Sequence, residues 1–216
     1  MSGNRFSWKL PRWAVVRIDE PPPQRPLKPI IKTLAAGAEL MRIYRPLPHG
    51  NRACSFRRTG PLHRFDHHAP AGDGTDQQAG SRGILYCGFS LSCCLVECFG
   101  DTGLIEAEGR QLALLETTRP IKLLDLQGNG AMRAGTVVAI SGAADRQLSQ
   151  KWSRYFYGCY QDIDGLIYSN AHNAEAAVAL YERTEDSLRC CHDFALNKSE
   201  LRSRILQVAL DHGLVP

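Results

Sequence analysis

The chain has 216 residues, 44% of them hydrophobic, and a formal net charge of +4. This length suits one domain with an extension better than two domains, and it allows a substantial buried core. No apolar run approaches the roughly 20 residues that a membrane helix needs, and the first thirty residues hold no apolar export signal. We therefore expect a soluble, cytoplasmic protein that does not bind membranes.

Eight cysteines raise the question of disulfides or a metal site. Two adjacent pairs, Cys93-Cys94 and Cys190-Cys191, and the apolar surroundings of most others indicate reduced thiols that pack as small hydrophobic groups. A zinc site is the alternative. However, no Cys-x-x-Cys occurs, and neither His67-His68 nor Cys190-Cys191-His192 has the spacing of a zinc finger. We expect no bound metal.

The first 30 residues are rich in proline, which predicts an extended arm without a core of its own. Residues 29–37 predict a short helix, and residues 39–44 predict the first strand of the folded domain. We therefore divide the chain into an arm with a short helix, residues 1–38, and one folded domain, residues 39–216.

A stretch of 23 residues contains six arginines, namely Arg42, Arg45, Arg52, Arg57, Arg58 and Arg64. The planar fork of arginine holds phosphate oxygens in pairs. Interspersed prolines and glycines predict a loop, and this loop lacks the aromatic side chains of a single-strand nucleic-acid platform. A compact phosphorylated ligand fits better than a polymer, so direct nucleic-acid binding is not expected. A merely solvated basic loop is the alternative.

The next segment, residues 67–82, is polar and glycine-rich and predicts an exposed loop that can cover a site. A buried strand over residues 84–89 follows, and then a helix that opens at Ser90 or Ser92, whose hydroxyl can cap the first free N–H groups. Glu97 lies at the flank of the apolar stripe of this helix, where it faces either solvent or a cleft.

The second half of the chain predicts five more strand or helix regions before the last helix. Two strands over residues 111–117 and 121–126 end at Asn129-Gly130, and a helix covers residues 145–158. A tight turn at residues 162–164 leads into a short buried strand that ends near residue 170, and residues 176–181 form another strand. The final helix, residues 199–212, has Asn197 and Glu200 in capping-box spacing and Gly213 as its stop.

No glycine-rich phosphate loop, Gly-x-Ser-x-Gly or His-Glu-x-x-His occurs, which excludes familiar nucleotide-binding and hydrolase classes. A dispersed set remains: Arg42, Tyr44, Arg64, Tyr86, Glu97 and the strand end Ser169-Asn170. Five pieces carry this set, in the order Leu40-Met-Arg-Ile-Tyr, His63-Arg-Phe-Asp, Gly83-Ile-Leu-Tyr with Leu95-Val-Glu-Cys-Phe, Asp164-Gly-Leu-Ile-Tyr, and Val178-Ala-Leu-Tyr-Glu-Arg183. In this order, over residues 40–183, they resemble the RES domain of bacterial toxin-antitoxin systems, named for its Arg, Glu and Ser.

The resemblance implies a mixed α/β fold like that of ADP-ribosyltransferases, a split sheet with flanking helices around an NAD cleft. It implies an NAD phosphorylase or glycohydrolase, with NAD as substrate, inorganic phosphate as possible co-substrate and no other cofactor. Glu97, Arg64 and Arg42 would be catalytic, and Tyr86, Tyr44, Ser169 and Asn170 would bind substrate. The partner would be a helix-turn-helix antitoxin. Use of NADP and self-association stay open.

The serine position is where this chain departs from the family pattern. The position two residues after the tyrosine is Asn170, and Ser169 reaches it only if the strand end shifts by one. The loop between Arg64 and Tyr86 is also long, and His63 stands where a glycine is common. A catalytically degenerate domain that binds a nucleotide or a partner is therefore one alternative. ADP-ribosyl transfer onto a macromolecule, which uses the same fold and a similar glutamate, is the other.

Overall fold

A computed structural model describes residues 17–25, 27–47, 50–69 and 81–216. Within these ranges, eight strands form one sheet in the order β1-β5-β6-β7-β3-β2-β4-β8, and β5 and β6 form its parallel pair. The strands are β1 (Ile31–Leu34), β2 (Glu39–Tyr44), β3 (Ile84–Gly88), β4 (Gln111–Thr117), β5 (Ile121–Asp125), β6 (Gly165–Ser169), β7 (Ala176–Tyr181) and β8 (Leu188–Ala195). The α-helices are α1 (Leu91–Phe99), α2 (Asn129–Arg133), α3 (Arg146–Cys159) and α4 (Ser199–His212), and short 3-10 helices cover Val138–Ser141 and Glu182–Ser187.

The sheet is split between β2 and β3. These two strands share one register pair, Met41 with Gly88, whereas β2 and β4 share six. Beyond that point a loop takes the place of β2 beside β3: Arg57 and Ile84 exchange two backbone hydrogen bonds of 2.9 and 3.0 Å. We call β1, β5, β6, β7 and β3 the first half-sheet, and β2, β4 and β8 the second half-sheet.

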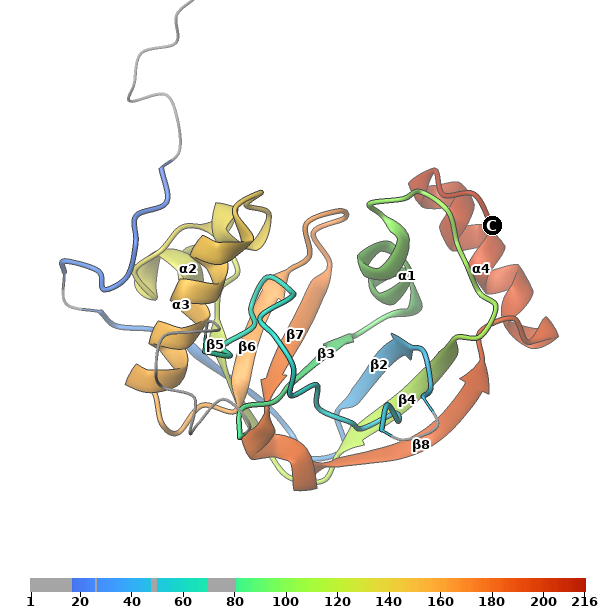
Figure 1. Cartoon of the computed structure of the whole chain (residues 1–216), viewed down its shortest axis with the longest axis horizontal. Coiled ribbons are helices and arrows are strands. Elements are labelled where there is room, and N and C mark those ends of the chain that lie inside the picture. The colour runs from blue at the N-terminus through green and yellow to red at the C-terminus, as the bar shows by residue number, and fades with distance from the viewer. Residues whose placement is uncertain (1–16, 26, 48–49, 70–80) are drawn as a thin grey trace, which may run out of the picture.

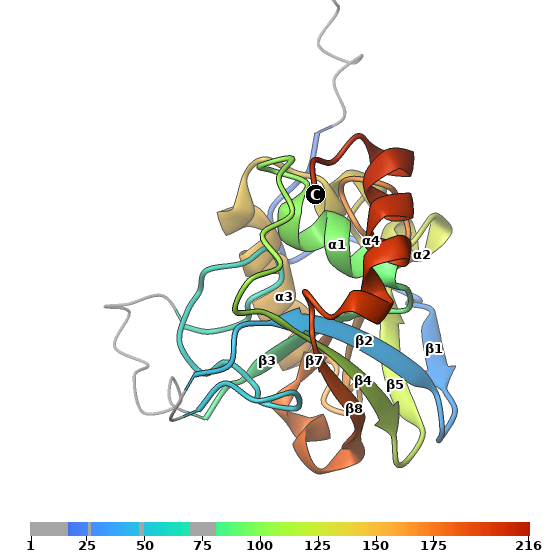
Figure 2. The ribbon, with the colours of Figure 1, turned by 90° about the vertical axis from the view of Figure 1, so that its right-hand side faces the viewer.

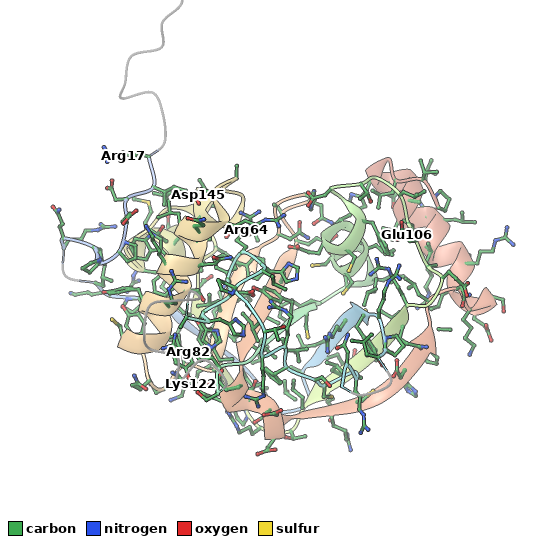
Figure 3. The ribbon with its side chains drawn as sticks, viewed as in Figure 1. Arg17, Arg64, Arg82, Glu106, Lys122 and Asp145 are labelled. Atoms are coloured by element: carbon green, nitrogen blue, oxygen red, sulfur yellow. The ribbon has the colours of Figure 1, made fainter. Side chains whose placement is uncertain are left out.

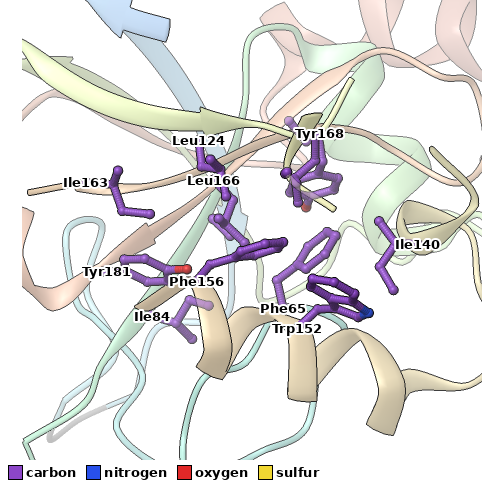
Figure 4. Close-up of a cluster of buried hydrophobic side chains, with 14 of the residues drawn as sticks. Phe65, Ile84, Leu124, Ile140, Trp152, Phe156, Ile163, Leu166, Tyr168 and Tyr181 are labelled. Atoms are coloured by element: carbon purple, nitrogen blue, oxygen red, sulfur yellow. The ribbon is translucent and has the colours of Figure 1, made fainter. Parts of the chain in front are cut away.

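Each half-sheet has its own helices (Figure 1). On the first, α3 covers β5, β6 and β7 through an aromatic cluster that includes Trp152, Phe156, Phe65 and Tyr181 (Figure 4). On the second, α1 and α4 lie against each other and cover β2 and β4 (Figure 2). A further apolar cluster fills the opposite, concave face of the curled sheet. Burial of these clusters supplies the main driving force for folding.

In the described part of the chain, no helix is long and apolar enough to cross a membrane.

Most predicted elements are confirmed. The mixed α/β fold with a split sheet and flanking helices is present. The strands over residues 39–44, 84–88, 111–117, 121–125, 165–169 and 176–181 form, as do the helices over 91–99, 146–159 and 199–212. Ser90 caps α1 by accepting a hydrogen bond from the Cys93 N–H at 2.9 Å. Gly213 ends α4 in the left-handed conformation with φ 67°.

Several local predictions are wrong. The predicted helix at residues 29–37 is strand β1, because its β-branched residues pair with β5. The two strands over 111–125 form, but Asn129 opens helix α2 rather than a closing turn. Lys198, not Asn197, precedes α4, and Asn197 instead donates a hydrogen bond to Glu108.

The predicted exposed loop at residues 67–82 begins with two buried histidines, His67 and His68. Residues 70–80 of this loop and residues 1–16 of the predicted arm lie outside the described residues. Residues 17–30 of the arm, where described, hold no helix or strand. They do contact the fold, since Trp152 donates a hydrogen bond of 2.8 Å to the carbonyl of Asp19.

Candidate functional site

A large cavity of about 1060 Å³ opens at the split in the sheet. Its walls come from β2 and β3, the loop over residues 50–64, helix α1, and the turns at residues 142–146 and 171–172. The volume lies at the upper end of the range of small-molecule sites, about 300–1,000 Å³. The site therefore exists because the two half-sheets separate, which leaves side chains of both facing one space.

Five of the seven predicted site residues line this cavity: Arg42, Tyr44, Arg64, Tyr86 and Glu97. Ser169 and Asn170 do not line it. The charged lining consists of the arginines 42, 57, 58, 64 and 146 against the carboxylates of Glu97 and Asp101. This excess of guanidinium groups favours an anionic ligand.

Glu97 projects from α1 into the cavity and is exposed there. No hydrogen bond or ion pair to the described residues engages its carboxylate. The walls of the cavity still remove much of the water around it, and this burial raises the pKa of Glu97, while the nearby His172 and then Arg64 act in the opposite direction. A carboxylate with these neighbours and no partner is available to a ligand.

Arg64 lies between the half of the molecule that carries α3 and the half that carries α1 (Figure 3). One amino group of its guanidinium donates a hydrogen bond to the carbonyl of Ala143. No carboxylate among the described residues pairs with Arg64. By contrast, Arg57, Arg58 and Arg146 each pair with a carboxylate. The charge of Arg64 is therefore uncompensated and faces the cavity.

Asp66 holds the segment that carries Arg64. Its fully buried carboxylate accepts hydrogen bonds from both the Arg57 guanidinium, at 2.7 Å, and the Tyr86 hydroxyl, at 2.9 Å. Burial alone would raise the pKa of Asp66, but the bonds from Arg57 and from the N–H groups of Leu62 and His63 outweigh it and lower the pKa. Because the Tyr86 hydroxyl donates to Asp66 and accepts from the Phe65 N–H, Tyr86 offers the cavity mainly its ring.

Arg42, on β2, builds another part of the cavity wall. Its guanidinium donates to the carbonyl oxygens of Arg52, Ala53 and Ser55 at 2.9 to 3.1 Å and to the side chain of Asn51 at 3.1 Å. It also lies 5.2 Å above the ring of Tyr44. The Tyr44 hydroxyl in turn donates to Asp193 at 2.6 Å. Most donors of Arg42 are thus engaged in holding the loop at residues 51–55.

The strand end at residues 169 and 170 serves local structure. Side chains alternate along β6, so Ser169 points to the opposite face from the cavity-lining Tyr168, and its hydroxyl accepts a hydrogen bond of 3.4 Å from Gln127. Asn170 is buried, and its side-chain oxygen accepts from the N–H groups of His172 and Asn173. Neither side chain reaches the space in front of Glu97.

Three charged or titratable residues that the sequence reasoning missed also line the cavity: Asp101, Arg146 and His172. The carboxylate of Asp101 lies 3.6 Å from His172 Nε2 and 3.6 Å from the Arg146 guanidinium. Since Arg146 begins α3 and Asp101 follows α1, this contact bridges the two halves of the molecule. The three residues are far apart in sequence, and no motif marked them.

The cysteines and possible metal ligands do not form a second centre. All eight cysteines are free thiols. Burial raises the pKa of Cys93 and of Cys98, next to Glu97 in the same helix, to about 11, so both are protonated at neutral pH. Within the described ranges, no group of three or more His, Cys, Asp or Glu side chains could hold a metal ion.

Comparison with known proteins agrees with this architecture. A probable toxin, y4kH, of Sinorhizobium fredii (strain NBRC 101917 / NGR234) is 29% identical over 112 residues, which are 52% of this chain and 87% of the relative. The crystal structure of the M. tuberculosis MbcT-MbcA toxin-antitoxin complex contains a chain of similar fold, with a TM-score of 0.53 and 15% identity over 74% of this chain and 85% of that chain. The RES domain profile matches residues 39–200. The chain therefore belongs to the RES domain family.

Proposed function

We propose that this protein cleaves the bond between nicotinamide and ribose in NAD. The products are nicotinamide and either ADP-ribose-1″-phosphate, when phosphate attacks, or ADP-ribose, when water attacks. The observation that carries the proposal is the unpartnered carboxylate of Glu97 in a cavity whose charged lining is mostly arginine. Membership in the RES family and the size of the cavity, which suits a dinucleotide, support it.

The chemistry of this bond calls for such a carboxylate. When the carbon–nitrogen bond breaks, its electron pair stays on the nicotinamide nitrogen, which becomes neutral and needs no acid to leave. Positive charge grows on the ribose, and a carboxylate placed beside it stabilises that transition state. Glu97 would take this role. Arg64, whose charge is uncompensated, would hold the pyrophosphate or an incoming phosphate.

The other predicted residues would act around these two. Tyr86 would pack its ring against the substrate, since its hydroxyl is engaged with Asp66. Arg42 would hold the cavity wall in place and would bind substrate through the N–H groups that are not already hydrogen-bonded to the loop. The ring of Tyr44 would support its guanidinium. Asn170 would influence the site through the turn that follows β6, whereas the Ser169 hydroxyl contacts Gln127 on the opposite face of the strand.

A direct test measures nicotinamide release by the purified full chain incubated with NAD, with and without inorganic phosphate. Glu97→Gln should lower the rate about 100- to 1,000-fold, because removing one preorganised contact to the transition state typically lowers kcat by that factor. Glu106→Gln is the matched control, since Glu106 is exposed outside the cavity (Figure 3). No release under either condition, or a Glu97→Gln variant equal to wild type, would contradict the proposal.

The same assay separates the alternatives. Radiolabel from NAD that ends on a protein or nucleic acid, instead of in free ADP-ribose or its phosphate, would identify an ADP-ribosyltransferase. Binding of NAD without turnover would identify a degenerate domain. The latter is motivated by the position of Asn170, which replaces the family serine and does not line the cavity.

We further propose that the protein acts as a toxin whose partner is an antitoxin. The relative in S. fredii is described as a probable toxin, and the structure of similar fold is a toxin-antitoxin complex. A helix-turn-helix antitoxin that fills the cavity opening would block the substrate. Co-expression with the product of a neighbouring gene, followed by co-purification and loss of nicotinamide release, tests this.

A further inference from the structure

His172 lies on a turn that is fixed to α1. The side-chain oxygen of Asn170 accepts hydrogen bonds from the N–H of His172 at 3.0 Å and of Asn173 at 2.9 Å. The side-chain amide of Asn170 donates to the sulfur of Cys93 in α1 at 3.4 Å. Ala174 completes the turn in the left-handed conformation, φ 59°. The backbone of His172 is therefore held at a set position relative to the helix that carries Glu97.

The imidazole ring of His172 lies beside Glu97. It packs so closely on Gly100 that a Cβ at that position would be 2.6 Å from Nδ1. Gly100 directly follows α1 and is three residues beyond Glu97, so the two occupy the same side of the helix, neighbours about 5–6 Å apart. Both Glu97 and His172 line the cavity.

The two ring nitrogens of His172 have different surroundings. Nε2 lies 3.6 Å from the carboxylate of Asp101, whereas Nδ1 has no hydrogen-bond partner in the described part of the chain. Around the ring, the charged groups are Glu97 and Asp101 from α1 and its end, Arg64 from the loop, and Arg146 from α3. The ring packs on Gly100 through Nδ1 and Cγ, Nδ1 keeps its hydrogen-bonding capacity, and a carboxylate near Nε2 can stabilise a positive charge on the ring, which suits a histidine base.

We propose that His172 is a further catalytic residue, the base that accepts the proton of the water that attacks the NAD ribose. This inference rests on the proposed function. As the water oxygen bonds to the ribose carbon, the carbon–nitrogen bond breaks, its electron pair stays on nicotinamide, and the water proton moves to His172 Nδ1. Asp101 stabilises the resulting imidazolium, which then releases the proton to solvent. Phosphate dianion attacks through an oxygen that carries no proton and needs no such base.

The test compares hydrolysis with phosphorolysis in His172→Gln. In phosphate-free buffer, nicotinamide release should fall about 100-fold or more, the usual contribution of a general base. With saturating phosphate, nicotinamide release should fall less than about tenfold, because phosphorolysis removes no proton and a general base contributes little to it. His192→Gln, on the exposed strand β8 outside the cavity, is the matched control.

Chemical rescue separates a base from a structural group. Imidazole added to His172→Ala should restore hydrolysis at least tenfold and leave phosphorolysis unchanged. Three results would overturn the assignment: equal losses of both reactions in His172→Gln, no rescue by imidazole, or a wild-type protein that consumes NAD only with phosphate. Failure of the proposed function has a different signature, the absence of nicotinamide release by wild type with either nucleophile.

Discussion

Asn170 fixes the backbone of His172 through a hydrogen bond of 3.0 Å from the His172 N–H to the Asn170 side-chain oxygen. Asn170 is 3% exposed, so its polar atoms depend on protein partners. Asn170 does not line the cavity, and its side chain instead holds the turn that carries the cavity-lining His172.

Asn170→Ala should lower the free energy of unfolding by about 1–3 kcal/mol, the cost of leaving buried hydrogen-bonding groups without a partner. Nicotinamide release should fall as well, because the turn no longer holds His172. Asn170→Ser should lose less of both, since a serine hydroxyl can accept from the N–H two residues on. Ser169→Ala is the control and should keep activity within about twofold, because only Gln127 contacts its hydroxyl. Urea denaturation and the NAD assay provide both measurements, and a Ser169→Ala variant weaker than Asn170→Ala would contradict the prediction.

Asp66→Asn should destabilise the protein by about 3 kcal/mol, because it leaves the Arg57 guanidinium without its buried partner. The KM for NAD should rise, since Asp66 also anchors Tyr86 and the segment that carries Arg64. Asp186→Asn, on an exposed position, should change neither quantity. Equal unfolding midpoints for the two variants in urea would show that Asp66 is not a structural anchor.

Arg42→Lys should loosen the loop at residues 51–55. A lysine ammonium cannot reproduce the fork that contacts three carbonyl oxygens and Asn51, so at least one hydrogen bond is lost, at about 1 kcal/mol each. Limited proteolysis within this loop should become faster, and the KM for NAD should increase more than kcat decreases. Arg202→Lys on the exposed surface of α4 is the matched control. Unchanged proteolysis would mean that Arg42 does not hold the loop.

Stability should decline in acid because of Glu182. Burial alone would raise its pKa, but hydrogen bonds from His67, the Gly83 N–H and Tyr157 lower the pKa to about 2. A carboxylate with a depressed pKa stabilises the fold fully above its unfolded pKa, near 4.3, and this contribution is lost as the pH falls toward 2. Glu182→Gln should therefore lower stability at pH 7 and flatten its dependence on pH between about 5 and 2. Urea unfolding at several pH values checks this, and a variant with the same slope as wild type would contradict it.

The sequence predicts the elements that depend on local chemistry. The cap of α1 and the buried strand before it follow from Ser90 and the apolar run, and Gly213 ends α4 as its position indicates. The placement of Glu97 on α1 follows from the same pattern. Its orientation toward a cavity does not, because that depends on where the other half-sheet lies.

The missed features depend on distant partners. Strand β1 pairs with β5, about 90 residues away, and this tertiary pairing decides its conformation. Strand β8 is an edge strand whose five central residues are exposed, so it lacks the apolar alternation that marks a strand. Asp66 ends the piece His63-Arg-Phe-Asp, but its role as an anchor comes from contacts across the fold, as does the position of His172, which no motif marked.

The single register pair between Met41 and Gly88 also determines how the molecule tolerates changes in length. Each half-sheet keeps its own ladder and its own helices on either side of this junction, and the loop that follows β2 crosses the gap and joins β3 through Arg57 and Ile84. We expect insertions at the exposed residues 45–47, ahead of the buried Ala53 and Phe56, to leave the strand pairings intact. The outer wall of the cavity can therefore differ in length among proteins that share this sheet, while the helix that carries Glu97 keeps its place.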